Sequence, residues 1–227
     1  IELQGTSSKD KLSVKVKKGT GDGFVNIGSV SGPALSSFSA KNSDLTGTGL
    51  NFGEAVKSIE LRDVKNGADI LVGGSFSTKT QIKLHDVSDG TDISVDGQLK
   101  LSAARIGDGT IQAALLSKLS VKGDAKAVVP ISGDFKSDVT IVPGKTLSAK
   151  EAKLSLLGSV SIAGRTQGAT FVVPGNAGPF KTGSFENSSL LIGYTPTNAA
   201  DPFGGGIFDG EFKLASFAAN GFNGLVG

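Results

Sequence analysis

The sequence contains two similar copies of a 15-residue segment, 23 residues apart. The first copy is Ser58–Val72 (SIELRDVKNGADILV) and the second is Gln81–Val95 (QIKLHDVSDGTDISV). Repetition at a fixed interval indicates units stacked on one another, because a single unit cannot bury its own apolar face. Each copy reads as a strand, a glycine-containing turn and a second strand. Eight aligned positions are identical: Ile59/Ile82, Leu61/Leu84, Asp63/Asp86, Val64/Val87, Gly67/Gly90, Asp69/Asp92, Ile70/Ile93 and Val72/Val95.

Short apolar runs recur through the rest of the chain at intervals near 20 residues and predict the position of each further unit. We therefore expect an all-β fold, a right-handed parallel β-helix (β-solenoid) with about 20 residues per coil. The right hand follows from the general preference of parallel β connections. The expected first strands contain Phe38–Ala40, Ile59–Leu61, Ile82–Leu84, Leu99–Leu101, Leu119–Val121, Val139–Ile141, Val160–Ile162, Phe185 and Phe217.

Two parts of the chain depart from this spacing. Residues 1–32 are expected to form an N-terminal strand, centred on 12–18, and a glycine-rich turn at 19–32 that caps the stack or serves assembly. Residues 33–227 are expected to form the solenoid. Within it, residues 193–210 contain two prolines and three consecutive glycines, which predicts a long loop on one side. The start at Ile1 and the closing GFNGLVG suggest a piece of a longer protein or a chain whose leader was removed.

Composition excludes several classes of protein. There is no cysteine, so disulfides, thiolate metal sites and a cysteine nucleophile are excluded. The net charge is +2 with the two signs interspersed, whereas nucleic-acid binding needs a clustered basic stripe. No segment approaches the length of an apolar membrane helix. We therefore expect neither nucleic acid nor a membrane span.

The single histidine, His85, is the only residue on which a Ser–His–Asp arrangement could be built. It follows Leu84 and corresponds to Arg62 in the other copy, so we expect it on the outer face, exposed to solvent. The sequence therefore predicts no catalytic residues.

Calcium binding is an alternative suggested by NGADILVGG at 66–74, which resembles half of the nonapeptide that binds calcium in β-rolls. The leading glycine pair is missing, and the second copy has Ser94 in the large apolar position. We expect Asp69 and Asp92 to accept hydrogen bonds from backbone amides in turns instead. No metal site and no cofactor site are predicted.

A polysaccharide-processing β-helix enzyme is the catalytic alternative. Charged residues that could lie along one face of the solenoid are Arg62, Asp63, Lys83, Asp86 and Arg105. Sugar rings usually stack on exposed aromatic side chains, and the sequence has one tyrosine and no tryptophan. Mixed charges on an outer face ordinarily serve solubility.

The last third of the chain carries a recurring pattern of a small residue, serine and an apolar residue. It occurs in GSVSIAG (158–164), GSFENSSLLIG (183–193) and ASFAANGFNGLVG (215–227), with the insert 191–209 after the second copy. This resembles the large repetitive β-strand-repeat cell-surface and adhesin-like proteins of environmental bacteria, planctomycetes among them. It is more loosely similar to haemagglutinin-type β-helical exoproteins. The resemblance implies an extracellular, elongated, structural or adhesive protein and carries no site residues.

The sequence thus predicts a non-catalytic structural or adhesive module at the cell surface, either part of a giant surface protein or a filament subunit. Its expected partners are copies of itself or neighbouring repeats of the same chain, and a surface glycan or protein ligand. Strand addition at the open ends is the expected mode of self-association.

Overall fold

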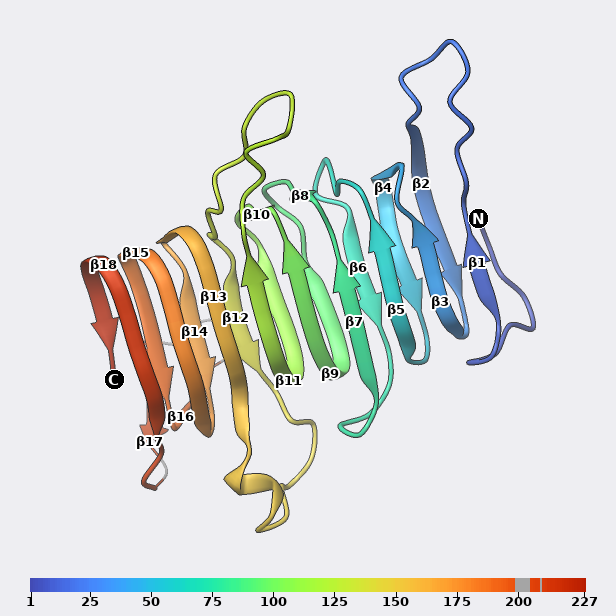
Figure 1. The fold of residues 1–227 in the computed structure, drawn as a ribbon. Coiled ribbons are helices and arrows are strands. Elements are labelled where there is room, and N and C mark those ends of the chain that lie inside the picture. Colours follow the sequence, from blue (N-terminus) through green and yellow to red (C-terminus); the bar gives the residue numbers. More distant parts are fainter. Residues whose placement is uncertain (199–204, 209) are drawn as a thin grey trace.

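The computed structural model describes residues 1–198, 205–208 and 210–227. This part of the protein is all-β, as predicted, and nearly all of its strand pairs are parallel. A single 3-10 turn, Glu151–Lys153 (η1), is the only helical element among the described residues. The strands form an elongated stack with the two termini at opposite ends (Figure 1).

Each turn of the chain contributes to three sides of the stack, which we call the first face, the second face and the short side. The first face contains β1 (Lys11–Ser13), β3 (Leu35–Ala40), β5 (Val56–Leu61), β7 (Lys79–Lys83), the later parts of β9 (Ile93–Ala103) and β11 (Thr110–Val121), most of β13 (Ser155–Gln167), and the earlier parts of β15 (Asn176–Ile192) and β18 (Leu214–Val226). The second face contains the later parts of β2 (Val25–Gly32) and β4 (Ser43–Phe52), β6 (Asp69–Val72), the earlier parts of β9 and β11, β12 (Asp138–Ile141), β14 (Thr170–Val173) and the end of β15. The short side contains β8 (Asp86–Val87), β10 (Arg105–Ile106) and a series of single bridges.

Long strands turn the corners between these sides. Strands β11 and β15 each pair with neighbours on more than one side, so β11, β12, β14, β15 and β13 close into a ring of five parallel strands. The interior of the stack is filled by one continuous group of buried apolar side chains.

Apolar residues at equivalent positions lie directly on one another inside the stack. Ile59 pairs in register with Ile82, as the repeat predicts, and both side chains are fully buried. Burying such a side chain contributes about 1.5–3 kcal/mol. The complete first-face column is Leu12, Phe38, Ile59, Ile82, Leu101, Leu119, Val160, Phe180 and Phe217.

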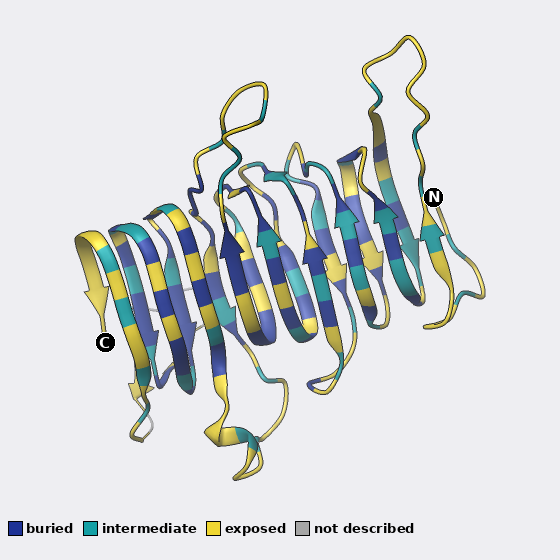
Figure 2. Cartoon of the chain, viewed as in Figure 1, coloured by how far each residue is buried: buried dark blue, intermediate teal, exposed yellow. Residues whose placement is uncertain are grey.

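The spacing along this column shows where the chain departs from a regular repeat. From Phe38 to Leu119, successive column residues are 18 to 23 residues apart, in agreement with the predicted 20. The interval grows to 41 residues between Leu119 and Val160, and to 37 between Phe180 and Phe217. Extra residues therefore leave the stack as projecting segments, while the column continues (Figure 2).

Two of the predicted first strands lie on other sides. Val139 belongs to β12 on the second face, where it pairs with Ile111 and Phe171. Phe185 lies on the short side, paired with Thr166 and Phe222. The prediction was wrong at these positions because every side of a turn has its own inward apolar residue, and apolar runs alone do not distinguish the sides.

The strands of the N-terminal region differ from those predicted. The glycine-rich segment expected as a turn contains β2, which pairs with β4 along its length and buries Ile27 and Val30. The expected strand at 12–18 is shorter, since β1 spans only three residues and pairs with β3.

Part of the predicted loop at 193–210 forms a short hairpin. Strands β16 (Tyr194–Pro196) and β17 (Gly206–Phe208) are antiparallel, and the rings of Tyr194 and Phe208 lie 4.9 Å apart. Residues 199–204 and 209 of that predicted loop lie outside the described residues.

Glycine is required where β4 passes from the short side to the second face. A Cβ atom on Gly47 would lie 2.2 Å from the carbonyl oxygen of Gly28 in the adjacent strand, whereas a Cβ on Gly28 would meet nothing within 4 Å.

We predict that Gly47→Ala lowers the free energy of unfolding by about 1–3 kcal/mol, because the two backbones must separate. The matched Gly28→Ala change should stay within about 0.5 kcal/mol. Chemical denaturation of both variants checks this, and equal effects would contradict the close approach.

Candidate binding groove between two projecting loops

Two loops project from the same edge of the stack, one before β2 and one after β11 (Figure 1). An open groove of about 620 Å³ lies between them. Phe24 lines it from the first loop, and Val128 and Val129 from the second. Arg62 and His85 contribute to its floor. The second loop is closed at its base by two backbone hydrogen bonds of 2.9 Å between Asp124 and Ile131.

The floor of the groove continues a row of charged residues along the short side. Stacking in register places equivalent residues of successive turns next to one another. Three aspartates come first along the row, and arginine and aspartate alternate after them. Arg105 donates two hydrogen bonds of 2.8 Å to Asp86, and Arg165 donates one of 3.1 Å to Asp134. Such bidentate and charge-assisted bonds are stronger than neutral ones. The row consists of Asp44, Asp63, Asp86, Arg105, Asp134 and Arg165.

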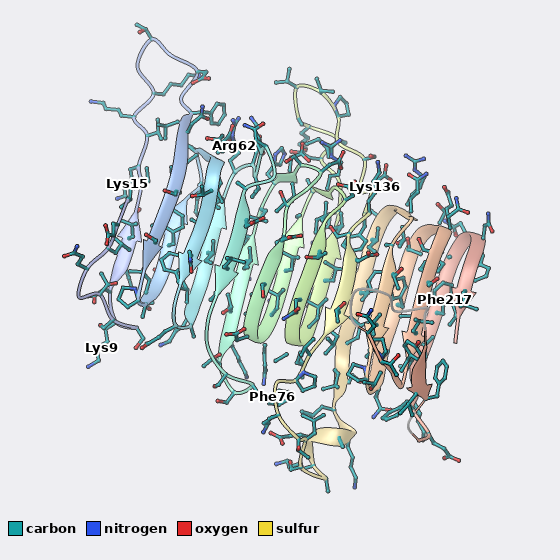
Figure 3. All side chains as sticks on the ribbon, turned by 180° about the vertical axis from the view of Figure 1, so that it is seen from behind. Lys9, Lys15, Arg62, Phe76, Lys136 and Phe217 are labelled. Carbon is teal, nitrogen blue, oxygen red and sulfur yellow. The ribbon has the colours of Figure 1, made fainter. Side chains whose placement is uncertain are left out.

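Asp44 is the most buried carboxylate of this row, with 4 % of its side chain exposed. Burial alone would raise its pKa, but hydrogen bonds from Arg62 and Lys65 outweigh that effect and hold the pKa below its usual value. The Arg62 guanidinium also lies over the Phe24 ring, 3.6 Å from its centre. Arg62, which is labelled in Figure 3, thereby connects the floor of the groove to the first loop.

His85 lies between two carboxylates. Its Nδ1 is 2.9 Å from Oδ1 of Asp63, and its Nε2 is 3.2 Å from Oδ2 of Asp124. A neutral imidazole can donate to only one of them, whereas the imidazolium donates to both. Burial acts to lower the pKa of His85, but the hydrogen bonds to Asp63 and Asp124 raise it above 6.5 overall. His85 therefore bridges the stack and the second loop, and its imidazolium form satisfies both carboxylates; we call this contact the His85 clamp.

This geometry does not match that of a general base. In a catalytic triad one imidazole nitrogen faces the nucleophile and the other faces a carboxylate. Both nitrogens of His85 face carboxylates, so neither is directed at a hydroxyl. His85 lies on the outer side of the stack, as predicted, and 35 % of its side chain is exposed to solvent.

The structure brings together most of the charged residues that the sequence placed on one face. Asp63, Asp86 and Arg105 share the short-side row, and Arg62 lies beside it. Lys83 is on the first face, at the edge of the groove.

The two aspartates considered for calcium bind backbone amides, as predicted, but not within the local turns expected from the sequence. Asp69 Oδ1 accepts from the amide of Asp92 at 3.1 Å, and Asp92 Oδ1 accepts from the amide of Thr110 at 2.9 Å. The donors belong to the next turn of the stack, so each carboxylate joins two turns. Within the described ranges, no group of three or more His, Asp or Glu residues is arranged to hold a metal ion.

Sequence reasoning missed the residues that the two loops supply. Asp124 and Val128 lie outside the repeat, so no equivalent position predicts their contacts. The available signal was the sequence AVVPI at 127–131, whose apolar residues precede a proline between two charged stretches. Val128 and Val129 are both largely exposed at the tip of the loop.

Comparisons with known proteins found no relative of the chain. No family model, no curated protein and no solved structure was found to match the chain. In the part of the chain that the structure describes, no helix has the length and apolar character to cross a membrane.

The His85 clamp should respond to pH. Its folded pKa is raised, so its stabilisation is present below the unfolded value of about 6.5 and is lost as pH rises through the folded value. We predict that the Asp124 and Ile131 amides lose protection from hydrogen exchange as pH rises above about 6.5, beyond the intrinsic rate change. NMR-detected exchange measures this.

The control for this experiment is His85→Gln, which removes the titrating group and should abolish the additional pH dependence. An NMR titration that gives His85 a pKa at or below the unfolded value would contradict the clamp.

Proposed function

We propose that the chain is a non-catalytic structural and adhesive module of a cell-surface protein, built as a right-handed parallel β-helix. The observation that carries this proposal is the unbroken first-face column from Leu12 to Phe217. A column that spans the stack, with parallel pairing between successive turns, suits a stiff rod whose role is to hold surfaces apart. The right-handed path follows the general preference of parallel β connections.

The placement of charge supports a structural role. Arg62, Arg105 and Arg165 each form an ion pair with an aspartate on a different strand segment. These pairs join neighbouring turns along the short side. Their carboxylates are thus occupied within the stack, unlike the acids of a polysaccharide-processing enzyme, which must face the substrate.

The last strand, β18, offers a surface for self-association. Eleven of its 13 residues pair with β15 on one edge, and Phe222, Leu225 and Val226 remain exposed. Phe217 stacks on Phe180 and Phe222 stacks on Phe185, at 5.5 and 5.7 Å between ring centres. A further strand from another copy would continue these columns and pair the open edge.

We predict that the protein forms end-to-end assemblies with increasing concentration. The double change Phe222→Lys with Val226→Lys should prevent them, because two charges would be buried at the junction. Val142→Lys with Leu154→Lys is the matched control, since these exposed apolar residues lie away from the end and outside the groove. Sedimentation velocity and electron microscopy follow the assembly. Equal assembly by both double variants would count against β18 as the contact.

The proposed location and the lack of catalysis need a separate experiment. We expect antibody against the chain to label intact cells of the source organism, and no new reducing ends or unsaturated sugars when the pure protein is incubated with acidic glycans. Labelling only after permeabilisation, or release of such products, would overturn the proposal. An experimental structure at side-chain resolution would test the handedness.

A further inference from the structure

The outer side of the first face carries five exposed lysines from four successive turns. They are Lys57 on β5, Lys79 and Lys83 on β7, Lys100 on β9 and Lys118 on β11. Lys100 on β9 is in register with Lys118 on β11. It is also in register with Gln81 on β7, the other neighbouring strand. Neighbouring strands are about 4.8 Å apart, so the backbones of Lys100 and Lys118 are separated by that distance, and the other three lysines are offset along the strands on either side. We call this set the lysine strip.

The lysine strip forms no ion pair. None of the five lysines takes part in one among the described residues. Glu60 on β5 lies in register with Lys83, but its carboxylate pairs with Lys41 at 3.3 Å. On the short side, by contrast, every arginine of the row has an aspartate partner. The net charge is only +2, so the strip reflects placement of charge rather than an excess of it.

The strip includes a shallow hollow. Lys57, Lys79 and Lys100 line a depression of about 390 Å³ together with Gln81, Gln98 and Ser117. Gln98 donates through Nε2 to the carbonyl of Phe76 at 3.1 Å, and Ser117 donates to that of Leu99 at 2.9 Å. Both side chains are therefore held in place, with their remaining acceptor oxygens available to hydroxyl groups of a ligand.

We propose that the lysine strip binds a polyuronate, a linear polysaccharide that carries one carboxylate on each sugar, lying across the strands along the axis of the stack. The inference rests on the proposed adhesive role and adds a ligand class to it. Five charges over four turns give roughly one cation per turn, at the strand spacing of about 4.8 Å. That density suits a polymer with one charge per sugar better than a heavily sulfated one.

Nucleic acid fits the strip less well. Single strands bind by stacking their bases on aromatic side chains within a basic groove. The outward residues of β5, β7 and the later parts of β9 and β11 are Lys, Gln, Ser and Glu, without an aromatic ring. Lysine also lacks the planar fork with which arginine binds phosphate in a bidentate manner.

Binding of polygalacturonate to the full chain, measured by calorimetry or biolayer interferometry, tests the inference. We expect binding that weakens with added salt, as screening of exposed charges requires. The triple change Lys79→Gln, Lys100→Gln and Lys118→Gln should weaken it about tenfold or more, since several exposed charge contacts are lost together. Replacing the same three lysines with arginine should retain binding.

The matched control is Lys9→Gln, Lys126→Gln and Lys153→Gln, which removes the same charge from exposed positions elsewhere. We expect this variant to bind like the original protein. Equal loss in both triple variants, equal binding of neutral dextran, or tighter binding of dextran sulfate or single-stranded DNA would overturn the inference. Circular dichroism verifies that all variants stay folded.

These outcomes are separable from the proposed function. If polygalacturonate fails to bind while the protein still assembles and labels intact cells, the ligand is wrong and the structural role stands. If labelling and assembly fail while binding persists, the proposed function is wrong and the lysine strip remains a polyuronate site.

Discussion

Parallel pairing between successive turns of the chain is the constraint on which the structure depends. Each turn must offer its backbone amides and carbonyls to the turns on both sides, because buried backbone groups need partners. Once the strands are in register, the side chains of equivalent residues lie on one another. The apolar ones fill the interior, as Ile59 and Ile82 do, and the charged ones become neighbours on the outside.

This register explains the different chemistry of the outer sides. On the short side, aspartate and arginine alternate from Asp86 onward, so Asp86 meets Arg105 and Asp134 meets Arg165. The two aspartates before them, Asp44 and Asp63, form ion pairs with Lys65 instead. On the first face, Lys100 meets Lys118 and no acid intervenes. The same geometric rule thus produces a neutralised surface in one place and a cationic surface in another, and the difference lies in the residue chosen at each turn.

The sequence was sufficient to predict what the repeat determines. Two similar segments predicted the stacking of Ile59 on Ile82, and they also placed His85 at the position of Arg62 on the outside. The position of Val139 could not be predicted, since an apolar residue is required on all three sides and turn lengths vary. The partner Asp124 could not be predicted either, because it belongs to a loop that occurs once, and its contact depends on the path of that loop in space.

The segment at 142–154 shows how the stack accommodates extra residues. It leaves the second face after β12 and returns to the first face at β13, and Leu119 and Val160 still lie on each other. The entropy of closing such a loop grows only slowly with its length. This corner is therefore a natural grafting site, where a foreign peptide or a small folded domain could be displayed at a fixed height along the rod, provided that Leu147 keeps its contact with the core.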